Sequence, residues 1–358
     1  MSEHVGKLIK IHGEYPENSI SSITELNFAW KTDGSCEWHK ECKFPTYGFS
    51  LLHTQFGNQD VLGQSFAGIP TMRFDKWRNQ TRFSIQAGFG IAWFNKPYDH
   101  LTNTKNLVIG SALANMSMVK IGFSKRLAGG WRYSLGASFT HCSNAHVAVP
   151  NIGANIVALH AGFSWGKLPE NPDYRLRPSH CFGLKRIWKF GMYGITGLQE
   201  IPGAIKPVNG GHYPVYGLGT QAVYHSRIGR DFHLGINYSY YPMYREYIVS
   251  QELFADGENE FRKAQTVVFF LGYEWKYNRF ALFVQTGLNL YSPFIHEMNN
   301  VWDLPKHGFL YQWTSNKLGY RFYLRKDEKS WQPYFHLAVK ANGGTADYLE
   351  TGVGFLLK

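Results

Sequence analysis

The sequence lacks any run of apolar residues long enough to cross a membrane as a helix. No window approaches the roughly 18 consecutive apolar residues that a membrane helix needs. A membrane-spanning fold of this chain must therefore be a closed β-barrel, which also satisfies its backbone hydrogen bonds within lipid. The first residues, MSEHVGK, lack the apolar segment and the cleavage site of a signal peptide. This predicts either a mature chain that starts at a new Met or a protein outside the membrane.

Cysteine is scarce, with four residues in 358. Cys36 and Cys42 are close enough in sequence to form a small disulfide loop in an oxidising periplasm, whereas Cys142 and Cys181 are expected to be unpaired. The chain has no CxxC pattern. We therefore expect no metal site and no cofactor.

Charged residues are also few, at 18%. Lys and Arg outnumber Asp and Glu by 37 to 26, which gives a net charge of +11. Because the basic residues are scattered singly and match no nucleic-acid motif, nucleic acid is not an expected partner. Scattered cations at a membrane rim suit an anionic lipid surface better, so outer-membrane lipids are the expected surroundings.

Aromatic residues and glycine are abundant, with 22 Tyr, 26 Phe, 11 Trp and 37 Gly. Membrane barrels have this profile because aromatic girdles lie at both membrane interfaces. A soluble all-β sandwich or barrel also favours Tyr, Phe and Gly and is the alternative. The alternation described next favours the membrane barrel.

From about residue 46 onward, apolar side chains alternate with small or polar ones, as in strands that have one apolar face. One such face consists of Phe83, Ile85, Ala87, Phe89, Ile91 and Trp93. Similar segments recur to the end of the chain, joined alternately by short turns and longer loops. The pattern predicts an all-β fold with one antiparallel transmembrane barrel of about 14 strands, or 12, over residues 46–358. Residues 1–45 are expected to be a periplasmic segment or a first strand, and 166–182 is a long connector among the short turns.

The apolar face of the predicted strand 131–143 ends in two polar residues, His141 and Ser143. Residues two apart on a strand share a face, with Cα atoms about 6.6–6.8 Å apart, so their side chains can meet. An imidazole can take the proton from a serine hydroxyl and make it a nucleophile. The pair is therefore a candidate acyl-transfer site on the lipid-facing wall, where polar side chains are usually functional.

The following segment supplies further candidates for this site. Asn155 has the parity that places it on the matching face of the next strand, within reach of His141. The loop between the two strands contains Asn144, Asn151 and Gly153. Their amide groups are candidate hydrogen-bond donors to an oxyanion or to the substrate.

These residues carry a resemblance to a known family in three short runs: His141-Cys142-Ser143-Asn144, Pro150-Asn151 and Gly153-Ala154-Asn155. The segment resembles the signature of the PagL-type lipid A 3-O-deacylases, also called the acyloxyacyl hydrolase family. The resemblance is specific over about residues 130–165 and silent after about residue 170.

The resemblance implies an outer-membrane serine esterase of bacteria that removes an ester-linked acyl chain, expected at the 3-O position, from the lipid A of lipopolysaccharide. By position, Ser143 would be the nucleophile and His141 the base. Asn144 and Asn151 would contribute to the oxyanion hole. Lipopolysaccharide is then the expected partner.

Two features depart from the family pattern. The best-known members have an acid where Asn155 stands, and in a Ser-His-Asp triad the change from Asp to Asn lowers kcat by about 10⁴. Those members are also barrels of about eight strands, fewer than the pattern predicts here. Two alternatives therefore stay open, namely a non-catalytic barrel (a channel or a lipopolysaccharide-binding scaffold) and a phospholipase acting on glycerolipids.

Overall fold

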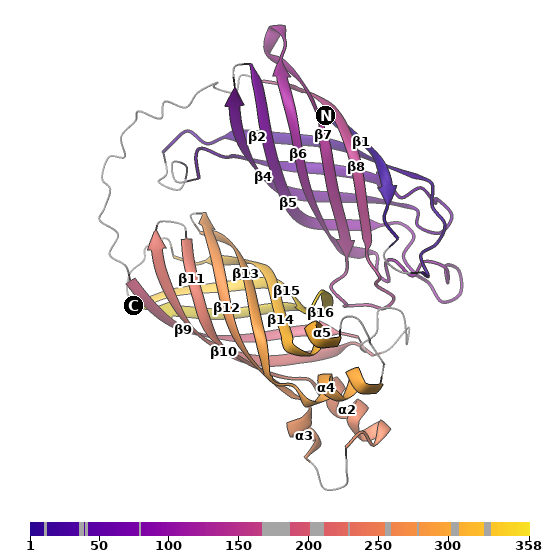
Figure 1. Cartoon of the computed structure of the whole chain (residues 1–358), viewed down its shortest axis with the longest axis vertical. Coiled ribbons are helices and arrows are strands. Elements are labelled where there is room, and N and C mark those ends of the chain that lie inside the picture. Colours follow the sequence, from indigo (N-terminus) through magenta and orange to yellow (C-terminus); the bar gives the residue numbers. More distant parts are fainter. Residues whose placement is uncertain are drawn as a thin grey trace. The chain divides into compact units, whose positions relative to one another are not determined.

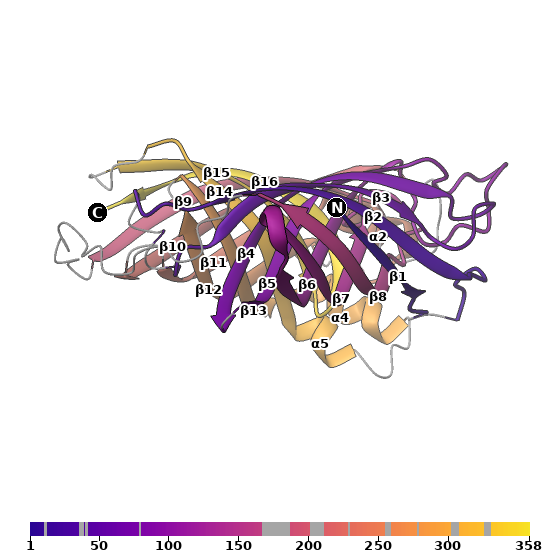
Figure 2. The same ribbon diagram turned by 90° about the horizontal axis from the view of Figure 1, so that it is seen from above.

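The computed structural model of the chain divides into two compact units, each with one closed antiparallel β-barrel (Figures 1 and 2). The N-terminal barrel, coloured indigo to magenta, contains strands β1 to β8, and the C-terminal barrel, coloured pink to yellow, contains β9 to β16. The structure describes residues 1–10, 13–35, 39, 42–78, 80–166, 187–200, 211–227, 230–254, 259–277, 279–301, 308–325 and 331–358.

The strands of the N-terminal barrel pair in sequence order, and β1 closes the sheet by pairing with β8. Their bounds are β1 (Ser2–Leu8), β2 (Ile20–Lys31), β3 (Thr46–Gln55), β4 (Gln64–Arg78), β5 (Thr81–Phe94), β6 (Leu113–Arg126), β7 (Trp131–Ser143) and β8 (Ala154–Trp165). Short turns join β4 to β5 and β6 to β7, the latter through the 3-10 turn η1 (Ala128–Gly130). The longer connectors 95–112 and 144–153 lie at the opposite end of the barrel.

The C-terminal barrel closes in the same way, through pairing of β16 with β9. Its strands are β9 (Ile187–Gln199), β10 (Tyr213–Arg227), β11 (Arg230–Tyr240), β12 (Gln265–Tyr277), β13 (Phe280–Tyr291), β14 (Thr314–Tyr323), β15 (Trp331–Asn342) and β16 (Thr345–Leu357). Helices interrupt two of the connectors: α2 (Pro242–Gln251), α3 (Glu260–Lys263), α4 (Pro293–Val301) and α5 (Gly308–Trp313). Among the described residues, no helix is long and apolar enough to cross a membrane.

The prediction of one barrel of about 14 strands was wrong, because the sheet closes twice and forms two barrels of eight strands each. The strands β1 and β2 belong to the first barrel and precede residue 46. Alternation identifies strands but not the pair at which a sheet closes, since that pairing joins residues far apart in sequence. The irregular connector 166–182 falls, in the sequence, between the last strand of the first barrel and the first strand of the second. All of it after residue 166 lies outside the described residues. The predicted Cys36–Cys42 disulfide and Cys181 also involve positions outside them.

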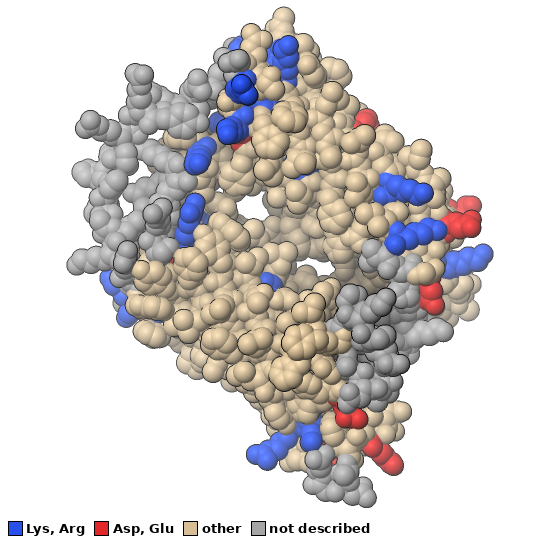
Figure 3. All heavy atoms as spheres, viewed as in Figure 1, with Lys and Arg blue, Asp and Glu red and all other residues tan. Residues whose placement is uncertain are grey.

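The outer wall of each barrel is apolar. On β7 and β8, the side chains of Leu135, Phe139 and Leu159 are exposed at 56%, 42% and 73%. On β9 and β10, Phe190 and Leu218 are both exposed at 61%. The visible walls carry few charged side chains, while Lys and Arg gather at the short-turn end of the N-terminal barrel, at the top of the view (Figure 3). Such walls suit contact with lipid hydrocarbon.

The lumen of the N-terminal barrel is layered along its axis. At the end with the long connectors, buried apolar side chains such as Ile23, Met116 and Ile156 pack together. At mid-height the carboxylate of Glu25 accepts hydrogen bonds from Ser50 on β3 and from Lys120 on β6. Because β2 and β6 lie on opposite sides of the barrel, the latter bond crosses the lumen.

The lumen of the C-terminal barrel is also crossed by hydrogen bonds. Gln221 on β10 donates to the hydroxyl of Tyr334 on β15 at 2.7 Å, and Arg321 on β14 donates to Glu274 on β12 at 2.8 Å. Helices α2, α3 and α4 gather at one end of this barrel (Figure 1). There, Tyr244 of α2 stacks on Phe294 of α4 with ring centroids 3.9 Å apart.

Candidate active site

His141 and Ser143 lie at the end of β7 in the N-terminal barrel, where the strand enters the loop 144–153. They share the face of Leu135 and Phe139, so the pair continues the exposed apolar wall. Both side chains are half-buried. The pair is therefore open to a lipid that lies against the outer wall of the barrel.

Asn155 on β8 lies directly opposite His141. Nδ1 of His141 donates a hydrogen bond to Oδ1 of Asn155 at 2.9 Å. Because an amide oxygen only accepts, this bond places the imidazole proton on Nδ1 and leaves Nε2 as the basic nitrogen. Asn155 thus orients the ring of His141, as an acid would, but supplies no full negative charge.

Asn151 connects the loop to Ser143. Its Nδ2 donates to Ser143 Oγ at 3.1 Å, while its Oδ1 accepts the backbone N–H of Asn144 at 3.1 Å. The side chain of Asn144 is held in turn by donating to the carbonyl of Ala148 at 2.7 Å. The loop therefore holds a fixed amide N–H beside the hydroxyl oxygen of Ser143.

Gly153 allows the loop to approach the pair closely. A Cβ at this position would lie 3.4 Å from Cε1 of His141 and 3.8 Å from Cβ of Ser143. Its φ of 78° is also in the left-handed region that favours glycine. The backbone N–H of Gly153 donates to the carbonyl of Val108 at 3.0 Å. That amide therefore fixes the loop to the connector 95–112, and the contribution of Gly153 to the site is space.

Tyr15 supports the same loop and was not predicted from the sequence. Its hydroxyl donates to the carbonyl of Gly153, and its side chain is buried. Burial raises the pKa of Tyr15 to about 12, so the hydroxyl stays protonated and can donate at neutral pH. No local signal in the sequence could have linked two residues 138 positions apart.

Two further features of the site were also missed. Ala145 and His146, just after the pair, have left-handed φ values of 55° and 65°, a strain that recurs at functional sites. On β6, Asn115 lies opposite Ser143, and Ser117 lies opposite His141. Both β6 side chains are half-buried and widen the polar area of the wall. Their parity could have placed them there.

Comparison with protein-family models gives two matches, one in each barrel. Residues 24–164 match the model described as lipid A 3-O-deacylase (PagL), and this range includes every candidate site residue. Residues 187–358 match the model described as acyloxyacyl hydrolase, C-terminal domain. The chain belongs to the family of PagL-type lipid A 3-O-deacylases, or acyloxyacyl hydrolases. The resemblance predicted from residues 130–165 is confirmed, and so is the class, that of an ester hydrolase.

The chain is also similar to solved outer-membrane proteins. The outer membrane enzyme PagL shares 21% identity over 45% of this chain and 95% of its own, with a TM-score of 0.34. The protein opdK from Pseudomonas aeruginosa shares 8% identity over 99% and 96%, with a TM-score of 0.23. Outer membrane phospholipase A from Escherichia coli shares 8% identity over 96% and 98%, with a TM-score of 0.18. No curated protein matches the sequence.

One cluster in the C-terminal barrel has the composition of a metal site. The ligand atoms of Asp231, His233 and Glu274 lie within 4.8 Å of one another and are buried. Glu274, however, accepts hydrogen bonds from Arg321 at 2.8 Å and from the hydroxyl of Tyr323 at 2.6 Å. A cation would have to displace this guanidinium, so the cluster fits an internal ion pair better than a metal centre. Its members lie on two strands, β11 and β12, without a recognisable spacing.

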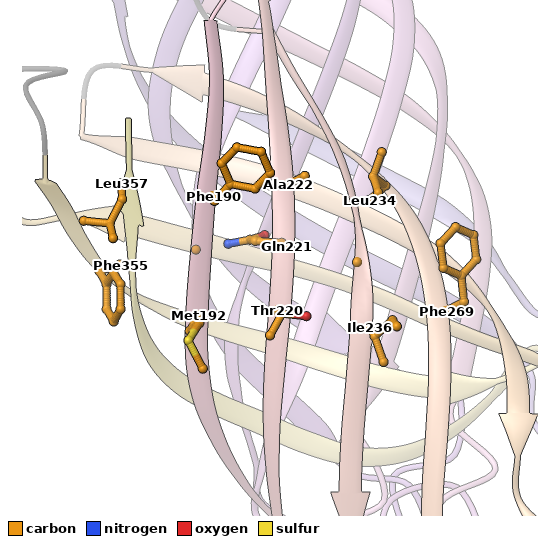
Figure 4. Close-up of a pocket in the computed structure, with 12 residues that line it drawn as sticks. Phe190, Met192, Thr220, Gln221, Ala222, Leu234, Ile236, Phe269, Phe355 and Leu357 are labelled. Carbon is orange, nitrogen blue, oxygen red and sulfur yellow. The ribbon is translucent and has the colours of Figure 1, made fainter.

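The outer wall of the C-terminal barrel has a shallow groove of about 530 Å³ (Figure 4). Phe190 and Met192 of β9, and Leu234 and Ile236 of β11, lie on either side of Thr220 of β10. None of the 12 lining residues has a side chain that titrates as an acid or a base. The groove therefore offers contact area for an apolar chain but no group for acid–base chemistry.

Proposed function

We propose that the N-terminal barrel removes one ester-linked acyl chain, at the 3-O position, from the lipid A of lipopolysaccharide in the bacterial outer membrane. The observation that carries this proposal is the hydrogen bond between His141 and Asn155 beside Ser143, on an exposed apolar wall. A site in this position meets a lipid substrate without removing it from the membrane.

In the proposed reaction, Ser143 Oγ attacks the ester carbonyl carbon while Nε2 of His141 takes the hydroxyl proton. The carbonyl oxygen becomes an oxyanion, and the side-chain N–H of Asn151 lies where it can stabilise that charge. Collapse breaks the ester bond and leaves an acyl group on Ser143, while His141 gives its proton to the departing sugar oxygen. Water then attacks the acyl-enzyme with His141 again as base, which releases a fatty acid and restores the serine.

Asn155 and Gly153 have supporting roles in this proposal. Asn155 keeps the proton of the neutral imidazole on Nδ1, so that Nε2 is free to take the proton of Ser143 and later that of water. Gly153 leaves room for the loop beside the ring of His141. Asn144, through its backbone N–H, fixes the amide plane of Asn151.

The test is expression of the Ser143→Ala variant in a Gram-negative host, followed by mass spectrometry of extracted lipid A. The wild type should remove one hydroxyacyl chain, and the variant should leave lipid A intact. Ser134→Ala is the matched control, because Ser134 lies on the same strand but bonds to the carbonyl of Gly162. Unchanged deacylation by Ser143→Ala would refute the proposal. Parallel assays with glycerophospholipids distinguish a phospholipase from a lipid A deacylase.

A channel is the alternative that the packing of the lumen disfavours. In the N-terminal barrel, the bond between Lys120 and Glu25 crosses the lumen, and an apolar cluster fills the end near the site. In the C-terminal barrel, the bond between Gln221 and Tyr334 crosses it. Steady conductance in planar bilayers, together with unaltered lipid A on expression, would favour a non-catalytic barrel instead.

A further inference from the structure

A group of cations lies in the lumen of the N-terminal barrel at its short-turn end. Four strands contribute side chains there, and by parity they point inward. We call these cations, together with one carboxylate and one indole among them, the basic cluster. Its cations are Lys31 from β2, Arg73 from β4, Arg82 from β5 and Arg132 from β7, and its other two members are Asp75 and Trp77 from β4. Arg132 is the second residue of β7, the strand that ends at Ser143, so about 36 Å of extended backbone separates the cluster from the candidate active site.

The charges of the basic cluster are not balanced. Among the described residues, Asp75 is the carboxylate paired with these cations, and four cations surround it. Its oxygens lie 3.0 Å from Nε of Arg73, 3.8 Å from Nζ of Lys31 and 3.9 Å from Nη1 of Arg82. The side chains of these three cations are at most 13% exposed. Burying several like charges around one carboxylate is unfavourable unless a further anion joins them.

Several hydrogen-bond donors in the basic cluster have no partner among the described residues. These buried donors are Nη2 of Arg73, Nη1 of Arg82 and Nε1 of Trp77. The side chain of Arg82 is 95% buried, with 5% exposed. A water molecule could satisfy a donor but would leave the excess charge uncompensated.

The cationic groups are also held in place. Nε of Arg82 donates to Oγ of Ser124 at 2.9 Å. The guanidinium carbons of Arg82 and Arg132 lie 5.7 and 5.0 Å from the ring centre of Trp77. Fixed guanidinium groups with unused N–H donors are the arrangement that binds tetrahedral oxyanions.

The middle of the same lumen provides an internal comparison. There, Glu25 is matched by Lys120 and accepts further hydrogen bonds from Ser2 and Ser50. Acid and base are balanced at that level and no anion is needed. The excess of cations is therefore a property of the short-turn end and not of the lumen in general.

We propose that the basic cluster binds a phosphate-type oxyanion, either free phosphate or the phosphomonoester headgroup of a lipid. The guanidinium groups of Arg73 and Arg82 and the indole N–H of Trp77 donate to its oxygens, and Lys31 and Arg132 add positive charge. This site is separate from the ester hydrolase site and does not depend on the role of Ser143.

Isothermal titration of the full-length protein in detergent micelles tests this site. One arm uses inorganic phosphate, with ionic strength held constant by chloride, and the other uses dihexanoyl phosphatidic acid. We expect one site per chain for phosphate, the lipid or both, and the arm that binds identifies the source of the anion. Arg82→Gln should weaken that binding by about 10- to 100-fold, because it removes charged hydrogen bonds. Arg78→Gln is the matched control, since Arg78 follows Trp77 on β4 and is exposed.

Two more variants separate binding from folding. Trp77→Phe keeps an aromatic ring and removes one donor, so it should weaken binding by about 2- to 10-fold. Asp75→Asn removes the competing carboxylate and should strengthen binding by about tenfold, a direction that misfolding cannot imitate. Failure of both ligands to bind, or equal weakening by Arg82→Gln and Arg78→Gln, would overturn the proposal.

Discussion

Replacing Asn155 with Asp is the sharpest test of how the site works. Oδ1 of Asn155 lies 2.9 Å from Nδ1 of His141, and Asp has nearly the same shape as Asn. The substitution therefore keeps the geometry of the hydrogen bond and adds one negative charge beside the imidazole. If His141 takes the proton of Ser143, the added charge stabilises the imidazolium formed in the transition state.

The size of the effect follows from the separation of the charges. Two unit charges about 4 Å apart attract by about 4 kcal/mol at an effective dielectric constant of about 20. Part of this is offset because the half-buried carboxylate loses water at a wall that faces lipid. A net gain of about 3 kcal/mol corresponds to a rise of about 100-fold in kcat. This lies below the factor of about 10⁴ between Asp and Asn in a Ser-His-Asp triad.

The assay is the initial rate of fatty acid release from lipid A in mixed micelles, at saturating substrate. Asn115→Asp is the matched control, because Asn115 lies opposite Ser143 on β6 and its carboxylate would not replace the bond to His141. Asn155→Ala should lower kcat by about tenfold or more, since the ring loses a hydrogen bond that orients it. The reasoning fails if Asn155→Asp is no faster than the wild type, or if Asn115→Asp is equally fast.

Three other substitutions have expected outcomes. Tyr15→Phe removes the donor to the carbonyl of Gly153 and should destabilise the loop by about 1–3 kcal/mol, seen as a several-fold lower kcat with an unchanged circular dichroism spectrum. Gly153→Ala should lower kcat by about 10- to 100-fold through left-handed strain and contact with the imidazole. Gly129→Ala has a similar φ, but its added Cβ would meet only Cδ1 of Trp131, at an ordinary contact distance of 3.7 Å, and it should retain activity. Glu25→Gln leaves Lys120, whose side chain is 12% exposed, without its partner and should reduce the free energy of unfolding by about 3 kcal/mol. Urea titration in micelles measures this change, and the exposed control Glu3→Gln should alter the free energy of unfolding little. The first prediction is contradicted if Tyr15→Phe leaves kcat unchanged. The second fails if Gly153→Ala and Gly129→Ala lose activity equally, and the third fails if Glu25→Gln and Glu3→Gln are equally stable.

The contact within the candidate site could be predicted from the sequence because it depends on parity. Side chains alternate along any strand, so His141 and Ser143 had to share a face, and Asn155 had to match them on the next strand. The hairpin register then places Asn155 opposite His141. Each of these steps is local, and none requires knowledge of how many strands the barrel has.

The closure of the sheet could not be predicted in the same way. Nothing in β8 distinguishes it from an ordinary middle strand, and its pairing with β1 joins opposite ends of a long segment. The contact of Tyr15 with Gly153 also joins residues far apart in sequence, so no local pattern predicts it. The resemblance could not be extended beyond about residue 170, because the second barrel has no short motif like that of 141–155. A family model matches this part of the chain only over its whole length, residues 187–358.

In the proposed mechanism, the chemistry of the wall explains why an amide can orient His141 in place of an acid. Asn155 is half-buried at the edge of an apolar surface that includes Val157 and Leu159, exposed at 48% and 73%. A carboxylate there stabilises the imidazolium of His141 but loses hydration in every state of the enzyme in which the ring is neutral. Asn keeps the orientation of the ring without that penalty. Asn155→Asp should therefore raise kcat and lower the thermal unfolding midpoint in the same protein. Two effects of opposite sign would show that the apolar wall on which the proposed substrate lies also makes the acid unfavourable.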